Sequence, residues 1–130
     1  MKKIILSTAV LLFAFSTSTI SAKETTNNPN HSEIIVNYNI NSFCKLIQMG
    51  DYDAVAALIK SGENVNRKSN GLTPLMFAAR HNKAKIAKLL IDSGAKLKAK
   101  SERSKITALE LAKRSKAKDA YKVIKKAMEK

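Results

Sequence analysis

The feature that most constrains the fold of this chain is a segment that occurs twice, ending first at Gly62 and again at Gly94. Ala54–Gly62 and Ile86–Gly94 both carry apolar residues at helical spacing, and both end in serine followed by glycine. A glycine after the last turn supplies the left-handed conformation that ends a helix at low steric cost. The sequence therefore predicts two equivalent helices that end in the same way.

A second marker predicts where other helices begin. Thr73–Met76 is echoed by Thr107–Glu110, at a spacing close to that of the two glycines. A threonine before a helix can accept a hydrogen bond from a free amide of the first turn. Proline is favoured at the first helical position, here Pro74, because the N–H that it lacks would have no partner inside the helix. Asn41 precedes Thr73 by the same spacing as Gly62 precedes Gly94. We therefore expect Asn41 to cap a helix in the same way.

Together the markers divide the chain into three repeated units, each with two short antiparallel helices and an extended loop. The units run over 41–68, 69–100 and 101–130. A period of about 33 residues with this content indicates stacked repeats that bury their apolar faces on one another. The predicted fold class is all-α, a solenoid of three helix-turn-helix units with short hairpin loops.

The residues before the first unit have the layout of a secretory signal peptide. Two lysines precede an apolar run over 4–15, and small polar residues lead to Ala22. The run is shorter than the ~20 residues of a membrane helix. We expect a cleavable signal peptide over 1–22, a polar tether over 23–40 and a secreted or periplasmic protein. The alternative is an uncleaved anchor, in which case only this segment contacts a membrane.

The middle unit carries a family motif. Asn70–Ala79 followed by Ile86–Ala95 resembles a nearly complete ankyrin repeat, and the resemblance extends over 41–130. The family motif has histidine where Met76 stands and glycine where Asn82 stands. Asparagine tolerates the left-handed turn between the two helices.

The outer units depart further from this motif. Gly50 occupies the turn position of the first unit, whereas Lys116, a poorer match, occupies that of the third. The third unit also lacks the proline, has one extra residue in its hairpin loop and ends in a helix predicted over 117–130. These departures suit a terminal capping repeat.

The resemblance implies a binding module whose protein partner docks on a concave surface. In this fold, hairpin-loop tips and the exposed ends of the first helices form that surface. Carried onto this chain, the predicted partner-binding residues are Gln48, Met49, Ser69, Asn70, Leu72, Arg80, His81, Lys100, Arg103, Arg114 and Ser115.

Charge is concentrated in the carboxyl-terminal half. Residues 23–79 are neutral overall, whereas residues 80–130 hold 17 basic and 5 acidic residues, a net charge of +12. Three interpretations remain open: a solvated cap, a docking face for an acidic protein, and a site for polyanions or anionic lipid. Nucleic acid is disfavoured because Tyr121 is the only aromatic residue in this basic run.

The apolar positions predict one continuous core. In the last helix the stripe of Ala120, Val123, Ile124, Ala127 and Met128 is expected to pack on Ala108, Leu109 and Leu111 rather than on a membrane. The predicted core comprises Leu46, Val55, Leu58, Leu75, Ala78, Leu89, Leu90, Leu109, Leu111, Val123 and Ile124.

No arrangement of residues points to catalysis, a cofactor or a metal. His31 and His81 lie in different segments without a second ligand, and Asp51 and Asp53 stand at a helix start, where acids are favoured anyway. The single cysteine, Cys44, is in register with Met76. It is expected to be a part-buried hydrophobe, the alternatives being an intermolecular disulfide or a redox-sensitive thiol.

Sequence alone therefore predicts a non-enzymatic module for protein–protein interaction outside the cytoplasm. We expect a monomer that binds a protein partner, in one interpretation an acidic one, through its concave face. The alternative function is electrostatic binding of polyanions or an anionic membrane surface. The sequence does not identify the partner.

Overall fold

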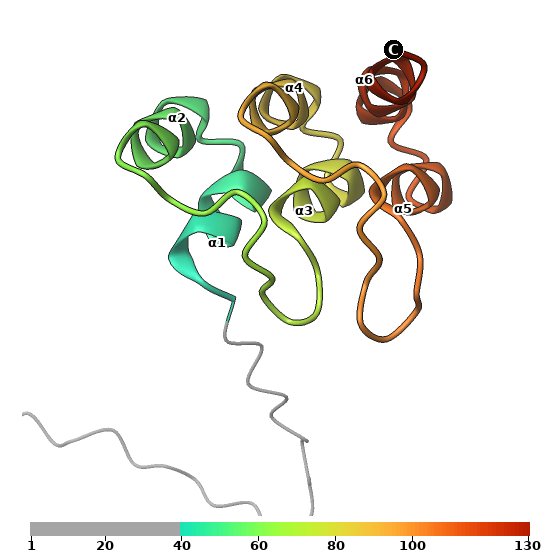
Figure 1. Ribbon diagram of the computed structural model, residues 1–130, viewed down its shortest axis with the longest axis horizontal. Coiled ribbons are helices and arrows are strands. Elements are labelled where there is room, and N and C mark those ends of the chain that lie inside the picture. Colours follow the sequence, from blue (N-terminus) through green and yellow to red (C-terminus); the bar gives the residue numbers. More distant parts are fainter. Residues whose placement is uncertain (1–39) are drawn as a thin grey trace, which may run out of the picture. The chain divides into compact units, whose positions relative to one another are not determined.

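The structure, a computed structural model, describes residues 40–130, and these fold into six helices (Figure 1). Residues 40–130 contain no strand, so the predicted all-α class is confirmed. The predicted signal peptide and the tether up to residue 39 lie outside the described residues. The helices are α1 Ser42–Met49, α2 Tyr52–Lys60, α3 Pro74–Arg80, α4 Ala84–Asp92, α5 Ala108–Arg114 and α6 Lys118–Met128.

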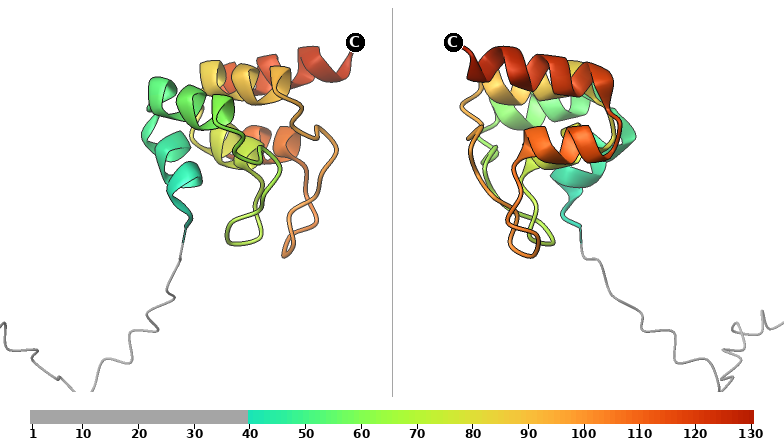
Figure 2. Two further views of the ribbon diagram at one scale, coloured as in Figure 1. Left: turned by 60° about the vertical axis from the view of Figure 1, so that its left-hand side comes forward. Right: turned by 90° about the vertical axis from the view of Figure 1, so that its right-hand side faces the viewer.

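The six helices of residues 40–130 form two layers. The first helices of the units, α1, α3 and α5, lie side by side in one layer, and α2, α4 and α6 form the other (Figures 1 and 2). The connections that follow α2 and α4 leave the second layer and project as hairpin loops beyond the first (Figure 2). Each helix thus packs on its partner in the unit and on the equivalent helix of a neighbouring unit.

Side-chain caps start the first helix of every unit. The Asn41 side chain accepts a hydrogen bond from the Cys44 N–H at 2.8 Å, which confirms the predicted cap. Thr73 caps α3 and Thr107 caps α5 through their hydroxyl oxygens. In α5 the Glu110 carboxylate also accepts a hydrogen bond from the Thr107 N–H at 2.7 Å. At the start of α5, the backbone N–H groups of Thr107 and Glu110, which have no partner within the helix, thus both find a side-chain acceptor.

The turn between the two helices of each unit requires a left-handed residue. Gly50, Asn82 and Lys116 have φ of 83°, 53° and 56°. Glycine adopts this conformation freely, and asparagine tolerates it, whereas a lysine Cβ crowds the backbone there. Lys116 nonetheless takes the same conformation, because the packing of two helices on their neighbours fixes the turn.

The hairpin loops differ in length more than the sequence analysis predicted. Ser69 precedes its helix cap, Thr73, by four positions, whereas Ser101 precedes Thr107 by six. The expected single extra residue in the third unit is therefore wrong, and the insertion is of two. Both lie in the loop, since the helices on either side keep their register.

The core is densest around α3, where residues 74–79 are all buried. Of the predicted core, Val55, Leu75, Ala78, Leu90 and Ile124 are buried. The six others are half-buried and pack against the core from its edge: Leu46, Leu58, Leu89, Leu109, Leu111 and Val123.

The prediction omitted several large core side chains. Phe43, Ile47, Met76, Phe77 and Ile86 are all buried. The prediction followed one apolar stripe per helix, whereas helices with a neighbour on each side bury a wider arc of their surface. The first layer therefore contributes more to the core than the pattern indicated.

The last helix is shorter than predicted and has a second packing partner. α6 runs over Lys118–Met128 and packs on α4 of the preceding unit as well as on α5. The Met128 side chain, expected to pack, is 38% exposed. The remaining four residues of the stripe are buried or half-buried.

Two asparagines hold neighbouring units together. Asn82, in the second unit, accepts hydrogen bonds from the Asp119 and Ala120 N–H groups at 3.1 and 3.0 Å. These are amides at the start of α6, which no side chain of its own unit caps. Asn66, in the first unit, accepts from the Lys96 N–H at 2.8 Å and donates to the Gly94 carbonyl at 3.1 Å. Each unit thus completes the backbone hydrogen bonding of the next.

Candidate partner-binding site

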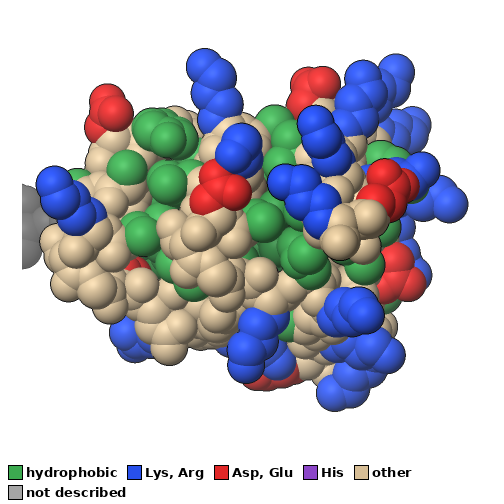
Figure 3. Space-filling model, turned by 45° about the horizontal axis from the view of Figure 1, so that its top comes forward, with side chains coloured by type: hydrophobic (Ala, Val, Ile, Leu, Met, Phe, Trp, Pro, Cys, Tyr) green, Lys and Arg blue, Asp and Glu red, His purple; other side chains and the backbone are tan. Residues whose placement is uncertain are grey.

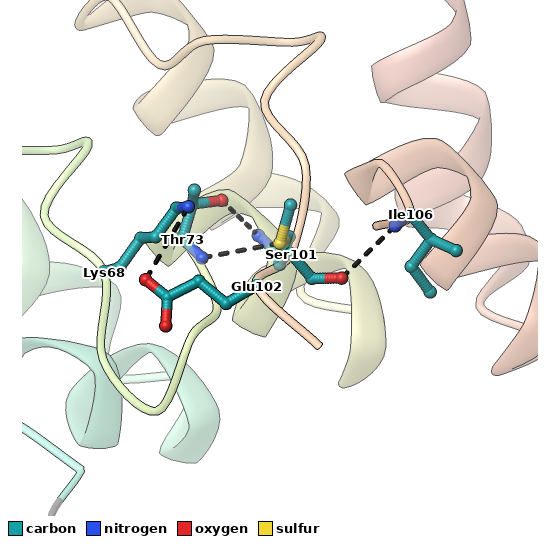
Figure 4. Close-up of polar contacts among 6 residues, drawn as sticks. Lys68, Thr73, Ser101, Glu102 and Ile106 are labelled. Atoms are coloured by element: carbon teal, nitrogen blue, oxygen red, sulfur yellow. Dashed lines mark hydrogen bonds and ion pairs between the residues drawn. The ribbon is translucent and has the colours of Figure 1, made fainter. Parts of the chain in front are cut away.

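Each hairpin loop is anchored by a buried serine at its base. Ser69 and Leu72 exchange two backbone hydrogen bonds of 2.9 and 3.0 Å, and the Ser69 hydroxyl accepts from the Asn41 N–H at 2.9 Å. In the longer loop the Ser101 N–H donates to the Ile106 carbonyl at 2.9 Å, and the Ser101 hydroxyl accepts from the Ile106 N–H at 3.2 Å. Figure 4 shows the bond to the hydroxyl. These bonds fix both loop bases.

The two hairpin loops are also bound to each other. The Glu102 N–H donates to the Gly71 carbonyl at 2.9 Å. The Lys68 ammonium lies 3.8 Å from a Glu102 carboxylate oxygen. Figure 4 shows the two side chains pointing toward one another. Both side chains of this ion pair are exposed, so the backbone hydrogen bond does more to align the loops. The loops present a common surface on the side of the first-helix layer.

Between these loops and the ends of α1 and α3 lies a hollow of about 520 Å³, which we call the concave hollow. Apolar side chains and loop polar groups both reach it. Its lining residues are Ile40, Gln48, Asn70, Gly71, Leu72, Phe77, Arg80, His81, Ser101, Arg103 and Ser104.

The electrostatic character of the concave hollow is positive. Two guanidinium groups, Arg80 and Arg103, line it, and no carboxylate of residues 40–130 does. Neither arginine forms an ion pair with any residue of 40–130. Desolvation, with smaller contributions from Arg80 and Lys83, lowers the pKa of the His81 imidazole, so His81 is neutral at neutral pH. Within the described part of the chain, the hollow thus offers a partner two cations without an ion pair and a neutral ring.

Six of the eleven predicted partner-binding residues meet at the concave hollow. They are Gln48, Asn70, Leu72, Arg80, His81 and Arg103. Four others do not line it, although all are exposed: Met49, Lys100, Arg114 and Ser115.

One predicted residue is placed differently. The Ser69 side chain is buried and its hydroxyl already accepts a hydrogen bond, so Ser69 supports the loop rather than facing a partner. Five lining residues were not among those predicted: Ile40, Gly71, Phe77, Ser101 and Ser104. The available signal for Ser101 was its register with Ser69, since the two serines hold the same place in successive repeats.

Cys44 is fully buried, which corrects the expected partial burial. Burial, followed by the negative charge of Glu63, raises the pKa of the thiol to about 12. Thiolates are the nucleophilic form of cysteine, so Cys44 is unreactive in the folded chain. This places it with the buried hydrophobes, where Met76 occupies the same position in the next unit.

Asp51 and Asp53 lie at the start of α2, as their place in the sequence predicted. Asp51 caps α2 by accepting a hydrogen bond from the Ala54 N–H at 3.1 Å, and Asp53 is exposed in the first turn. Within residues 40–130 no three His, Cys, Asp or Glu side chains gather in a way that would hold a metal ion. None of the six described helices is long and apolar enough to cross a membrane.

The second layer carries much of the positive charge. Figure 3 shows green apolar side chains in the grooves between the helices, with blue lysine and arginine side chains gathered toward the carboxyl-terminal end. One groove between α4 and α6 encloses about 320 Å³, with an apolar floor of Ile91, Val123 and Ala127. Lys88, Lys126, Lys130 and Asp92 line its edges.

Comparison with known proteins bears on this arrangement. A family model described as ankyrin repeats (3 copies) matches residues 26–129. No curated protein matches the chain. Among solved structures, the chain is similar to one in the complex of the predatory endopeptidase Bd0816 from Bdellovibrio bacteriovorus with immunity protein Bd3460. The match has 28% identity and a TM-score of 0.63, and covers 67% of this chain but only 46% of that one.

Proposed function

Because the chain belongs to the ankyrin-repeat family, we propose that it is an interaction module that binds a protein partner outside the cytoplasm through its concave hollow. Ankyrin repeats are protein-interaction modules, so partner binding follows from the family. The use of the concave hollow and the compartment are the finer parts of the proposal. We also propose that the module has no catalytic activity of its own.

The observation that carries this proposal is a pair of guanidinium groups in the hollow that have no ion-pair partner within residues 40–130. Arg80 extends from the end of α3 and Arg103 from the second hairpin loop, so they approach a common ligand from two elements. Arginine forms bidentate hydrogen bonds to carboxylates. Leu72 and Phe77 add apolar surface to the same hollow. The best ligand is therefore a protein loop that presents carboxylates next to an apolar side chain.

The similar solved structure suggests a class of partner. That structure is a complex between an endopeptidase and an immunity protein. By this likeness we propose an enzyme, in the first instance an endopeptidase, as the partner of this chain. Binding at an enzyme's cleft would make the module an inhibitor or a protector of that enzyme.

Export rests on the amino-terminal sequence. The lysines at 2 and 3, the apolar run and Ala22 support a cleavable signal peptide and a secreted or periplasmic product. Amino-terminal sequencing of protein recovered outside the cytoplasm tests this. A mature chain that starts at Lys23 is expected, and retention of Met1 in the recovered protein would contradict it.

Affinity capture from extracytoplasmic extract tests the site. We expect the wild-type chain to enrich one protein at both low and high salt, and the variant Arg80→Glu/Arg103→Glu to lose it. The matched control Lys85→Glu/Lys130→Glu makes the same charge change at exposed positions outside the hollow and should retain the partner. Undiminished capture by a folded Arg80→Glu/Arg103→Glu variant would exclude the concave hollow.

A second candidate function is binding to polyanions or to an anionic membrane surface. It is favoured by the apolar groove between α4 and α6 with its three lysines. Binding to vesicles that contain an anionic lipid should then fall steeply as salt rises. A Lys88→Glu/Lys126→Glu variant should lose vesicle binding while keeping the captured protein. No binding to anionic vesicles at low salt would exclude the membrane surface as the ligand.

A further inference from the structure

A second hollow lies at the outer end of the third repeat, where no element of residues 40–130 covers α5 and α6. It encloses about 440 Å³ and has an apolar floor formed by Ala112, Ala117 and Tyr121. Four lysines, and no carboxylate, surround that floor: Lys113, Lys116, Lys118 and Lys122. None of the four is in an ion pair within the described part of the chain. We call this surface the lysine end.

The two interfaces inside the stack show what such a surface contacts. The turn residue of one repeat meets the start of the second helix of the next. Gly50 lies against Lys83, whose Nζ would be 3.0 Å from a Cβ at Gly50. Asn82 lies against Asp119, with its side chain bound to the amides of Asp119 and Ala120 and its amide nitrogen 3.3 Å from the Asp119 carboxylate.

The register extends this contact beyond the third repeat. Lys116 has the left-handed conformation of Gly50 and Asn82 and occupies their place in the third repeat. Lys83 is the N-cap of the second helix of its repeat, and Asp119 is the second residue of that helix in the third repeat. A further repeat stacked on the third would therefore place its residues at these two positions against Lys116. In the first repeat these positions hold Asp51 and Asp53.

The amino-terminal end of the stack is therefore chemically complementary to the lysine end. Asp51 and Asp53 are both exposed. Asp51 uses one carboxylate oxygen to cap α2, which leaves the other available, and Asp53 has no ion-pair partner within residues 40–130. Two carboxylates at one end thus match four ammonium groups at the other, and none of the six is in an ion pair within residues 40–130.

We propose that a second copy of this chain stacks its first repeat on the lysine end, with Lys116 of one copy between Asp51 and Asp53 of the next. The inference is independent of the proposed function, because the concave hollow lies on a different face. Such a head-to-tail contact leaves both outer ends free and can propagate. It uses surface ion pairs, which are individually weak, so the monomer expected from the sequence is the species at low concentration.

Sedimentation velocity on protein produced from the full sequence tests the proposal, over about 10 µM to 1 mM in 0.15 M salt. The weight-average sedimentation coefficient should rise with concentration. Lys116→Asp and Asp53→Lys should each weaken association roughly 10-fold, since each replaces attraction by repulsion across the contact. Aspartate tolerates the left-handed conformation better than lysine does, so Lys116→Asp should fold. Circular dichroism checks this.

The two variants together give the sharpest test. In an equal mixture, the aspartate introduced by Lys116→Asp meets the lysine introduced by Asp53→Lys, and the native Lys116 meets the native Asp53 at the reciprocal contact. Association that is lost in each variant alone should therefore return in the mixture. The control Lys98→Asp, with the same charge change at an exposed loop position, should associate like the wild type.

Three results would overturn the proposal. One is a wild-type chain that stays monomeric over the whole range, which would leave the lysine end as a solvated cap or as a site for an acidic partner. Another is an equal loss in Lys98→Asp, which would make the association a general charge effect. The third is a mixture that remains monomeric, which would rule out the register of Lys116 with Asp53.

Discussion

Helices α3 and α5 are the same element in neighbouring repeats, yet their environments differ. Both have seven residues, and both begin after a threonine whose hydroxyl caps the helix. Residues 74–79 of α3 are all buried, whereas α5 buries only Ala108 and Ala112. The difference arises because α3 lies between α1 and α5, while α5 has a neighbour on one side only. In a stack of repeats, the number of neighbours decides how much a helix contributes to stability.

The largest expected change in the free energy of unfolding comes from removing the leucine side chain at equivalent positions of α3 and α5. Leu75→Ala removes a fully buried side chain and should lower the free energy of unfolding by about 2–5 kcal/mol. Leu109→Ala, at the half-buried equivalent in α5, should cost roughly 1–2 kcal/mol because less apolar area is lost. Urea unfolding followed by circular dichroism measures both. Equal losses would show that the second neighbour contributes little.

The next largest change in stability is expected on loss of the hydrogen bonds that join the second and third repeats. Asn82→Gly keeps the left-handed turn but removes the oxygen that accepts from Asp119 and Ala120. The expected loss is about 1 kcal/mol, the usual cost of losing a helix cap. Urea unfolding of this variant beside the wild type gives the value. No loss would mean that water replaces the side chain at the start of α6.

A glycine at the equivalent turn position of the third repeat should raise the stability of the protein instead of lowering it. Lys116 adopts φ of 56° and its side chain makes no hydrogen bond within residues 40–130. Lys116→Gly should therefore relieve left-handed strain and raise stability by about 0.5–1 kcal/mol. Thermal unfolding detects this as a higher Tm. A lower Tm would indicate that Lys116 makes contacts that outweigh its strain.

The smallest effect is a pH dependence confined to α5. Hydrogen bonds from the Thr107 N–H and hydroxyl lower the pKa of Glu110 from its ordinary value of 4.5. A lowered folded-state pKa gives a stabilising contribution that is present above pH 4.5 and is lost as the pH falls through the folded value. The Thr107 amide resonance should shift in that range by NMR. Met76 holds the equivalent position in α3, so the Thr73 amide should not move. The Glu110→Gln variant should abolish the Thr107 shift.

The sequence predicted those features that depend on local chemistry. The glycines at 62 and 94 follow the ends of α2 and α4, and Asn41, Thr73 and Thr107 cap the helices that follow them. Helix caps and the glycines that end helices act on residues within a few positions of them, so the sequence alone is enough to recognise them. The period of about 33 residues then indicated stacking.

Features that depend on contacts between repeats were not predictable in the same way. Ser69 looks like a loop residue in the sequence, but its hydroxyl binds the N–H of Asn41, which belongs to the preceding repeat. Cys44 is completely buried because α3 covers α1, which local pattern does not reveal. Arg80 and Arg103 meet at one hollow only because the second hairpin loop lies beside the end of α3. The prediction that both arginines belong to one binding surface came from the family resemblance and not from their spacing in the sequence.

The Asn82 side chain also has a consequence for the order in which the chain folds. Its oxygen supplies the acceptor for two amides at the start of α6, so α6 is completed by a residue synthesised one repeat earlier. Chains emerge from the ribosome amino terminus first, so the second repeat is present before α6 needs it. Helix formation has a costly nucleus, which a preformed acceptor lowers. The last helix is thus suited to form on a second repeat that is already in place, so that this end of the stack grows in the direction of synthesis.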